Sequence, residues 1–265
     1  MTIQIKASEV LGRFSLEGRV ALVTGSGSGI GERMAHVLAA AGARVACVAR
    51  RVERVEAVAQ AIRDADGQAM ACRMDVADKA SIGPALDAIE AHFGQPVEIL
   101  VNNAGLSNPT VFQQMSDEQW TSLLDVNLSG PYYAAQAVVQ RLIAAGKGGS
   151  IINIASILGH LAYPAFLNYG TTKGALIHMT RYMALDLLGH GIRVNAIAPG
   201  YFPSEMTNPF YESEAGIKEI ANLPAKRLGR LEELDGPLLL LASDASSYMN
   251  GSVLTVDYGH SVRLS

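Results

Sequence analysis

Seven short runs of apolar residues alternate along the chain with longer segments in which apolar positions recur at helical spacing. The short runs are nearly continuous in valine, isoleucine, alanine and leucine, which is typical of strands buried on both faces of a parallel sheet. We predict these strands at residues 19–24, 44–48, 69–74, 99–102, 150–154, 192–197 and 253–256. Because strands and helices alternate strictly, the pattern predicts an α/β fold, with a Rossmann-type doubly wound parallel sheet of about seven strands in a three-layer αβα arrangement.

Helical periodicity is clearest in three of the longer segments. After the first strand, apolar residues keep one face at positions 30, 34, 37, 38 and 41. Ser116 and Gln119 have the spacing of a capping box and predict the start of a long helix that runs towards Ala144. Another helix is predicted from about Asn168 to Leu188.

One stretch, residues 201–226, breaks this rhythm with prolines and aromatic residues between the sixth strand and a helix near Leu231. An insertion of this length at the carboxyl end of a strand is a candidate substrate lid, although a surface loop without a role is the alternative. We expect residues 1–265 to form one domain, with residues 1–17 as an N-terminal extension.

Composition narrows the class of protein. The 265 residues are 49% hydrophobic and 17% charged, which suits a large α/β core. The net charge of −4 and the lack of a basic run argue against nucleic acid or an anionic membrane as a partner. No signal peptide or apolar run of membrane-spanning length is evident, so a cytoplasmic protein is expected. Two isolated cysteines and scattered histidines predict no metal site.

A glycine-rich turn, Thr24 to Gly31, lies between the first strand and the first long helix. Glycines there permit a tight turn and a close approach of the backbone to a pyrophosphate, while the helix N-terminus offers free N–H groups. The turn therefore predicts a dinucleotide site. Its candidate cofactor-binding residues are Gly25, Ser26, Ser28, Gly29, Ile30 and Gly31.

The end of the second strand bears on which cofactor is bound. An enzyme that uses NAD usually carries an acidic residue there to bind the adenosine ribose, whereas this chain has Ala49 followed by Arg50 and Arg51. Arginine can bind a 2′-phosphate through charge-assisted hydrogen bonds. The sequence therefore favours NADP(H), with Arg50 as the main contact and Arg51 as the second choice. NAD(H) stays possible if both arginines only face solvent.

Four polar residues are candidates for the chemical step. Tyr169 and Lys173 are four residues apart near the start of a predicted helix, so they lie side by side on one face. Ser156 ends the fifth predicted strand, and Asn127 lies in the long helix after the fourth. Two further turns, Asn102 to Gly105 and Pro199-Gly200, close the fourth and sixth strands.

Taken together, these motifs resemble the short-chain dehydrogenase/reductase family in its single-domain form, and they cover most of the chain. The resemblance implies that Asn127, Ser156, Tyr169 and Lys173 are catalytic, and that Tyr169 and Lys173 also contact the cofactor. It adds further cofactor-binding positions: Asp75 and Val76 at the adenine, Asn103, Ala104 and Gly105 beside the ribose, and Pro199, Gly200, Phe202 and Ser204 at the nicotinamide. Ser204 stands where the family usually has threonine. The family is usually dimeric or tetrameric, which predicts a homodimer or homotetramer.

The residue types suit the interconversion of a secondary alcohol and a ketone. Tyr169 would exchange a proton with the substrate oxygen, Lys173 would lower the pKa of the phenol, and Ser156 would stabilise charge on that oxygen. Asn127 would hold a water that links Lys173 to solvent, as the resemblance implies. We expect an NADP(H)-dependent carbonyl reductase. The alternatives are an NAD(H)-dependent alcohol dehydrogenase, a dehydratase or epimerase, and a non-enzymatic NADP sensor.

The substrate side is less well defined by the sequence. Its candidate residues follow the fifth strand or lie in the lid segment, and they are Ser156, Ile157, Leu158, His160, Tyr163, Phe166, Phe202, Met206 and Phe210. Most of these side chains are apolar, so a hydrophobic or aromatic small-molecule carbonyl compound is the expected substrate.

Overall fold

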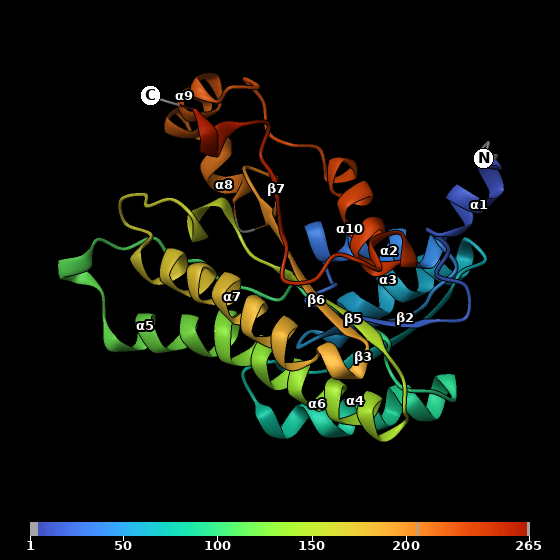
Figure 1. Ribbon diagram of the computed structural model, residues 1–265. Helices are drawn as coiled ribbons and strands as arrows, with labels where there is room; N and C mark the ends of the chain where they lie inside the picture. Colours follow the sequence, from blue (N-terminus) through green and yellow to red (C-terminus); the bar gives the residue numbers. More distant parts are fainter. Residues whose placement is uncertain (1–4, 206, 264–265) are drawn as a thin grey trace.

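A seven-stranded parallel sheet forms the centre of the protein (Figure 1). The computed structural model describes residues 5–205 and 207–263. The strands are β1 (Val20–Thr24), β2 (Arg44–Ala49), β3 (Gln68–Arg73), β4 (Ile99–Asn102), β5 (Gly149–Ile154), β6 (Ile192–Pro199) and β7 (Val253–Val256). Their order is β3-β2-β1-β4-β5-β6-β7, so the predicted doubly wound sheet is confirmed, and most strand ends lie within one residue of the predicted ends.

Each strand contributes side chains to two separate cores, because its side chains alternate between the faces of the sheet. In β1, Ala21 and Val23 pack into one core cluster, while Val20 and Leu22 pack into the cluster on the opposite face. This double burial explains why the strands are continuous apolar runs rather than alternating patterns.

Helices cover both faces and complete three layers (Figure 1). One face carries α2 (Gly29–Ala40), α3 (Val52–Asp64) and α10 (Asp235–Ala242), whose buried residues belong to the first cluster. The other carries α4 (Lys79–Phe93), α6 (Gly130–Ala144) and α7 (Leu167–Asp186). Before the sheet, α1 (Ala7–Gly12) lies in the N-terminal extension, and Leu16 after it is fully buried.

The long helix predicted up to Ala144 is interrupted. It begins as expected, because Ser116 Oγ accepts from Gln119 N at 3.1 Å and Gln119 Oε1 accepts from Ser116 N at 3.0 Å. However, α5 (Asp117–Leu124) is followed by one π-helical turn, Asp125–Ser129, before α6 begins. Pro131 has no N–H to donate to the carbonyl four residues earlier, and the Gly130 N–H bonds to the Asp125 carbonyl instead.

The segment at residues 201–226 contains two helices that the sequence analysis did not predict. They are α8 (Asn208–Tyr211) and α9 (Glu214–Asn222), and they lie beyond the carboxyl end of β6 (Figure 1). Ser213 begins α9 as an N-cap, since its Oγ accepts from Gly216 N at 3.1 Å. Prolines within α8 and around both short helices obscured the helical periodicity.

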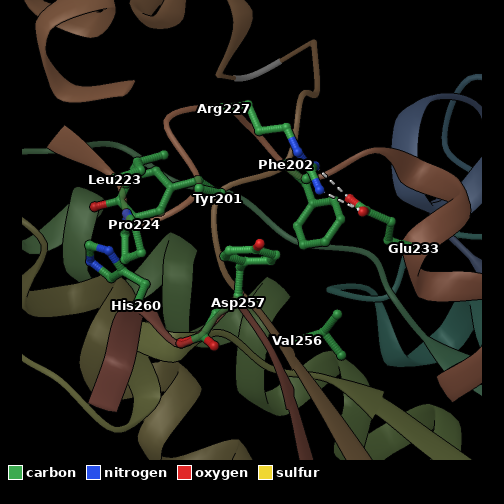
Figure 2. A pocket seen from close by; sticks show the side chains of 12 residues that line it. Tyr201, Phe202, Leu223, Pro224, Arg227, Glu233, Val256, Asp257 and His260 are labelled. Atoms are coloured by element: carbon green, nitrogen blue, oxygen red, sulfur yellow. Dashed lines mark hydrogen bonds and ion pairs between the residues drawn. The ribbon is translucent and has the colours of Figure 1, made fainter. Parts of the chain in front are cut away.

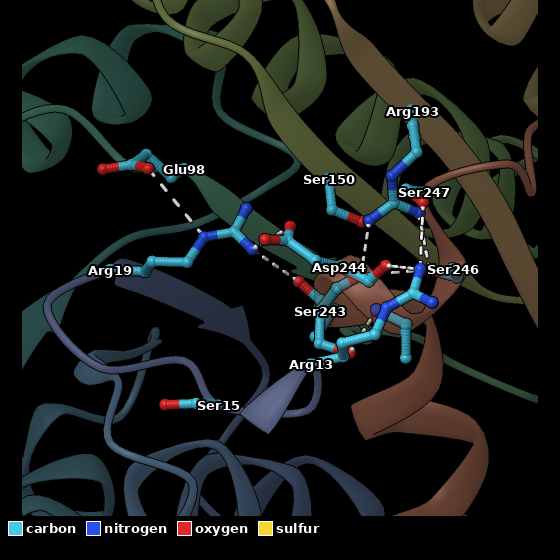
Figure 3. A network of polar contacts seen from close by, with 12 residues as sticks. Arg13, Ser15, Arg19, Glu98, Ser150, Arg193, Ser243, Asp244, Ser246 and Ser247 are labelled. Carbon is cyan, nitrogen blue, oxygen red and sulfur yellow. Dashed lines mark hydrogen bonds and ion pairs between the residues drawn. The ribbon is translucent and has the colours of Figure 1, made fainter. Parts of the chain in front are cut away.

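A polar network fastens the end of α10 to the sheet (Figure 3). Arg193 on β6 donates to the carbonyls of Leu241 and Ser243 at 3.1 and 3.0 Å, and Arg19 donates to Ala242 O at 3.0 Å. These carbonyls belong to the last turn of the helix and the residue after it, where positive charge is favourable. The network therefore satisfies the open carbonyls of α10 from the opposite end of the sheet to the candidate site.

Candidate active site

Tyr169 and Lys173 lie one turn apart at the start of α7, as predicted. Asn168, only 1% exposed, fixes this end of the helix: its Nδ2 donates to Asn108 Oδ1 at 2.8 Å and its Oδ1 accepts from Tyr169 N at 2.8 Å. The Nδ2 group also reaches Gln119 O at 3.2 Å. Asn168 thus joins the loop after β4, α5 and α7 around the tyrosine. The sequence analysis missed this positioning residue because its partners are distant in sequence.

Ser156 comes next to this pair because the turn after β5 packs closely on α7. A Cβ at Gly159 would lie 2.9 Å from the Lys173 backbone, so only glycine permits this approach. Ser156 is 7% exposed, and its Oγ accepts from Leu158 N at 3.1 Å. The structure therefore brings together Ser156, Tyr169 and Lys173, which are separated by up to seventeen positions in the chain.

Burial sets the electrostatics of this cluster. Lys173 Nζ donates to Ile154 O at 2.8 Å and lies 5.6 Å from the centroid of the Tyr169 ring. Burial lowers the pKa of Lys173 to about 8. Burial also raises the pKa of the Tyr169 phenol, and the Ser156 side chain acts in the opposite direction. The sequence analysis expected Lys173 to lower the pKa of Tyr169, but the burial of both groups is the larger effect.

Asn127 adjoins the same cluster from the π-helical turn. Its Oδ1 accepts from Leu106 N at 2.8 Å, and its Nδ2 donates to Leu106 O at 2.9 Å and to Thr172 Oγ1 at 3.3 Å. A Cβ at Gly105 would lie 3.5 Å from Asn127 Oδ1 and 3.7 Å from Lys173 Nζ. Both polar atoms of the amide group already have partners, and Pro131 has no N–H to donate to the backbone carbonyl of Asn127, so this carbonyl is suited to hold a water.

Because Lys173 is buried, we expect the free energy of unfolding to depend on pH. Between about pH 8 and the usual lysine pKa of 10.5, the unfolded chain binds a proton that the folded protein does not hold. The free energy of unfolding contributed by Lys173 therefore rises as pH increases through this interval. We expect urea denaturation to show wild type gaining stability relative to Lys173→Met between about pH 7 and about pH 9, below the range in which tyrosine titrates. Parallel pH curves for the two proteins would contradict this.

Hydrogen bonds from the loop after β4 support the glycine-rich turn. Asn103 Nδ2 donates to Thr24 O at 2.9 Å and Gly25 O at 3.1 Å. Thr24 Oγ1 accepts from both Asn103 N and Ala104 N at 3.0 Å, a role that the sequence analysis did not assign. A Cβ at Gly31 would lie 2.3 Å from Asn103 Nδ2, so the closing of the turn requires glycine there.

The N-terminus of α2 can accept an anionic ligand. Ser28 is its N-cap residue but makes no side-chain capping hydrogen bond, which leaves N–H groups of the first turn without that partner. These groups, from Gly29 and the residues after it, face the place where a dinucleotide pyrophosphate binds in this kind of turn. Ile30 packs against the core, and Ser26 is fully buried under the turn. The residues present therefore fit a dinucleotide.

Three arginines lie beside the end of β2. Arg50 is exposed and forms no ion pair within the described residues, whereas Arg51 pairs with Glu205 at 3.5 Å. Arg54, in the first turn of α3, also pairs with Glu205, and a Cβ at Gly27 would lie 3.1 Å from Arg54 Cβ. Arg54 therefore borders the glycine-rich turn. The sequence analysis missed it, although its position one turn beyond Arg50 is visible in the sequence.

The remaining predicted cofactor residues lie at the same edge of the sheet. Asp75 and Val76 follow β3, where Asp75 Oδ1 accepts from Ala77 N at 3.1 Å. Pro199 ends β6 and Gly200 follows it. Ser204 shares a hydrogen bond of 2.9 Å with Thr207 through their hydroxyls, and its Cα would lie 3.8 Å from a Cβ at Gly29. The start of the segment at residues 201–226 thus lies against the glycine-rich turn.

The predicted substrate residues are divided between the surface and the core. Ile157 is buried, Leu158 and Phe166 are half-buried, and His160, Tyr163 and Phe210 are exposed. The Phe202 side chain packs into the core instead, at 6% exposure. Met206 lies outside the described residues. A cavity of about 130 Å³ beside Tyr201 is lined by Phe202, Arg227, Asp257 and His260 among others, but not by Ser156 or Tyr169 (Figure 2).

Two features are absent from the described part of the chain. Residues 5–205 and 207–263 contain no group of three or more histidine, cysteine, aspartate or glutamate side chains placed to hold a metal ion. Within these same ranges, no helix is long and apolar enough to cross a membrane.

Comparisons with known proteins agree with this geometry. A family model described as short chain dehydrogenase matches residues 19–215. Gluconate 5-dehydrogenase of Gluconobacter oxydans is 39% identical over 253 residues, or 95% of this chain and 98% of that protein. D-threitol dehydrogenase of Mycolicibacterium smegmatis is 36% identical over 250 residues, or 94% of this chain and 95% of that protein.

A solved structure extends the agreement to three dimensions. Gluconate 5-dehydrogenase from Burkholderia cenocepacia J2315, in complex with NADP and tartrate, superimposes with a TM-score of 0.91 at 40% identity. The match covers 96% of this chain and 99% of that chain. The chain therefore belongs to the short-chain dehydrogenase/reductase family and is an oxidoreductase of that family.

Proposed function

We propose that this protein interconverts a secondary alcohol and a ketone with NADP(H), using Tyr169 as the acid and base. The observation that supports this most strongly is the meeting of Ser156, Tyr169 and Lys173 at the carboxyl end of β5, the edge of the parallel sheet at which the glycine-rich turn follows β1. Ligands of open α/β sheets bind at this edge. Alcohol–ketone interconversion needs a proton donor, a group that stabilises charge on the substrate oxygen, and a dinucleotide site. Tyr169, Ser156 and the glycine-rich turn are suited to these three roles.

Residues of this chain would carry out the proton transfer. In ketone reduction Tyr169 donates its phenolic proton to the substrate oxygen, and in alcohol oxidation it takes that proton back. Ser156 donates to the same oxygen and stabilises its developing charge. Lys173 supplies a nearby cation that favours the phenolate, and the Asn127 carbonyl would hold the water that connects Lys173 to solvent. The nicotinamide, when bound, supplies or accepts the hydride.

The preference for NADP(H) rests on Arg50. This side chain lies at the end of β2 with no carboxylate pairing it among the described residues, while Glu205 engages Arg51 and Arg54. An unpaired guanidinium at this place suits a 2′-phosphate. The NADP bound to the Burkholderia cenocepacia relative supports the same assignment.

Arg50→Ala is expected to weaken NADPH binding by roughly 10- to 100-fold, because a hydrogen bond to a charged group contributes about 1.5–3 kcal/mol. NADH lacks the 2′-phosphate and serves as the internal control, with an affinity that should change little. The quenching of protein fluorescence by each cofactor measures both dissociation constants. Equal losses for NADPH and NADH would remove the basis of the cofactor assignment and favour an NAD(H) enzyme.

Turnover tests the proposal as a whole. Purified protein should reduce NADP⁺ in the presence of secondary alcohols and oxidise NADPH in the presence of ketones, followed by the absorbance of the reduced nicotinamide. Tight NADPH binding without turnover of any alcohol or ketone in a broad panel would instead favour a sensor protein on this scaffold.

A further inference from the structure

Three tyrosines besides Tyr169 gather where the lid faces the candidate active site. Tyr163 continues a row of rings from the catalytic tyrosine, with centroids 6.3 Å apart from Tyr169 to Phe166 and 5.8 Å from Phe166 to Tyr163. Tyr201, after β6, and Tyr211, at the end of α8, lie 6.4 Å apart by their centroids. These side chains bring hydroxyl groups into surroundings that the sequence analysis expected to be mostly apolar.

Glu219 on α9 connects these tyrosines. Tyr201 donates its hydroxyl to Glu219 Oε1 at 3.2 Å. Burial, reinforced by the Glu219 charge and its hydrogen bond, raises the pKa of the half-buried Tyr201. Partial desolvation and the Glu219 charge also raise the pKa of Tyr163, although much of this side chain is exposed. Burial also raises the pKa of Tyr211 to about 12, with smaller contributions from Tyr169 and Glu219. Tyr211 thus lies beside Tyr201, and the charges of Tyr169 and Glu219 both act on its hydroxyl group.

No cation neutralises the carboxylate within the described part of the chain. Glu219 takes part in none of the ion pairs there, although its neighbour Lys218 does, with Glu214 Oε1 2.7 Å from its Nζ. Arg227, at the far end of the lid, forms a bidentate pair with Glu233 at 2.8 Å for each contact (Figure 2). Lys218 and Arg227 are thus engaged by other carboxylates, and the charge in contact with the Tyr201 hydroxyl is the negative charge of Glu219.

A carboxylate among phenols recognises one class of ligand better than others. It accepts hydrogen bonds from hydroxyl groups, and tyrosine hydroxyls both donate and accept them. Aromatic rings at the same place can pack against the C–H faces of a carbon chain. An anionic ligand would meet like-charge repulsion and would leave Glu219 without a compensating partner.

We propose that Glu219, with Tyr201 and Tyr211, forms a subsite for the distal hydroxyl groups of a neutral polyhydroxylated substrate, a polyol or its keto form, and that it disfavours sugar acids. This inference rests on the proposed alcohol–ketone activity. It replaces the hydrophobic carbonyl compound expected from the sequence, because Glu219 and the tyrosine hydroxyls converge only in the fold. Glu219 is a specificity-determining residue and has no part in the proton transfer.

Matched substrate pairs test the proposal. Each pair shares its carbon chain and stereochemistry but ends in either CH₂OH or a carboxylate, as in glucitol and gluconate or threitol and threonate. With NADP⁺, we expect kcat/KM for the polyol to exceed that for the acid by at least about tenfold, the discrimination that roughly 1.4 kcal/mol produces. Titration calorimetry of both compounds into the NADPH-loaded protein should give the same order without turnover.

Two variants identify the responsible group. Glu219→Gln removes the charge at nearly constant shape and should move the ratio of the two kcat/KM values towards one, mainly through KM. Glu212→Gln removes an exposed charge between α8 and α9 and should leave the ratio unchanged. Equal or better use of the acid by wild type, or an unchanged ratio in folded Glu219→Gln, would overturn the proposal. Simple secondary alcohols distinguish a failure of this inference from a failure of the proposed activity. No turnover even with these alcohols would refute the proposed activity, and this inference with it.

Discussion

Tyr169→Phe should lower kcat for both ketone reduction and alcohol oxidation by about 10²- to 10⁴-fold, the usual contribution of a positioned acid or base. The variant removes only the hydroxyl, so the ring keeps its edge contact with Phe166. Ser156 would still contact the substrate oxygen but could not replace the proton, since a serine hydroxyl is far less acidic than a phenol. Initial rates with saturating NADPH for the reduction, and with saturating NADP⁺ for the oxidation, measure the loss.

The matched control is Tyr182→Phe, which removes a hydroxyl from the exposed, opposite end of α7, where Tyr182 is 61% exposed. It should retain wild-type rates, and both variants should bind NADPH with similar affinity. A Tyr169→Phe protein that binds cofactor normally and turns over within a few-fold of wild type would show that another group transfers the proton.

Gly31→Ala should cost both stability and cofactor binding. The added methyl group would lie 2.3 Å from Asn103 Nδ2 and 2.4 Å from Gly25 O, well inside van der Waals contact. Relief requires Asn103 to withdraw from its bonds to Thr24 and Gly25, so the turn loses its support. Overpacking of this kind costs about 1–3 kcal/mol. We expect a lower urea midpoint and at least tenfold weaker NADPH binding, since the displaced backbone is the proposed binding site of the pyrophosphate.

Gly189→Ala provides the comparison for the glycine variant. Gly189 is exposed in the short turn after α7, and a Cβ there would meet no atom within 4 Å. Its stability should stay within about 0.5 kcal/mol of wild type, as for most surface substitutions. If Gly31→Ala behaved like Gly189→Ala in both assays, the close packing of Asn103 under the turn would not control cofactor binding.

The sheet could be predicted from the sequence because its signals are local. Each buried strand is a continuous apolar run, and Ser116 with Gln119 marks a helix start within four residues. The helices α8 and α9 escaped prediction because they are short and because prolines lie within α8 and around both helices. The π-helical turn at Asn127 escaped as well, since one proline changes the hydrogen bonds of a segment whose periodicity still looks helical.

The proposed catalytic positions were likewise accessible as motifs, whereas the residues that support them were not. Tyr169 and Lys173 share a helix face, which spacing reveals. Asn168 acts through Asn108 and α5, and Glu205 reaches α3 from the lid, so their roles depend on contacts between distant segments. The role proposed for Glu219 likewise depends on a contact that forms only in the fold, between α9 and Tyr201. The sequence consequently predicted the reaction in more detail than the substrate.

Isotope transfer tests the central claim most directly. The protein is incubated with NADP⁺ and a secondary alcohol that carries deuterium at the carbinol carbon, and the reduced cofactor is analysed by mass spectrometry. We expect a single deuterium in the dihydronicotinamide ring and an equal amount of ketone, because the carbon-bound hydrogen moves as hydride while Tyr169 takes the hydroxyl proton. Ketone formation without label in the cofactor, or no reduced cofactor with any alcohol tested, would contradict the account.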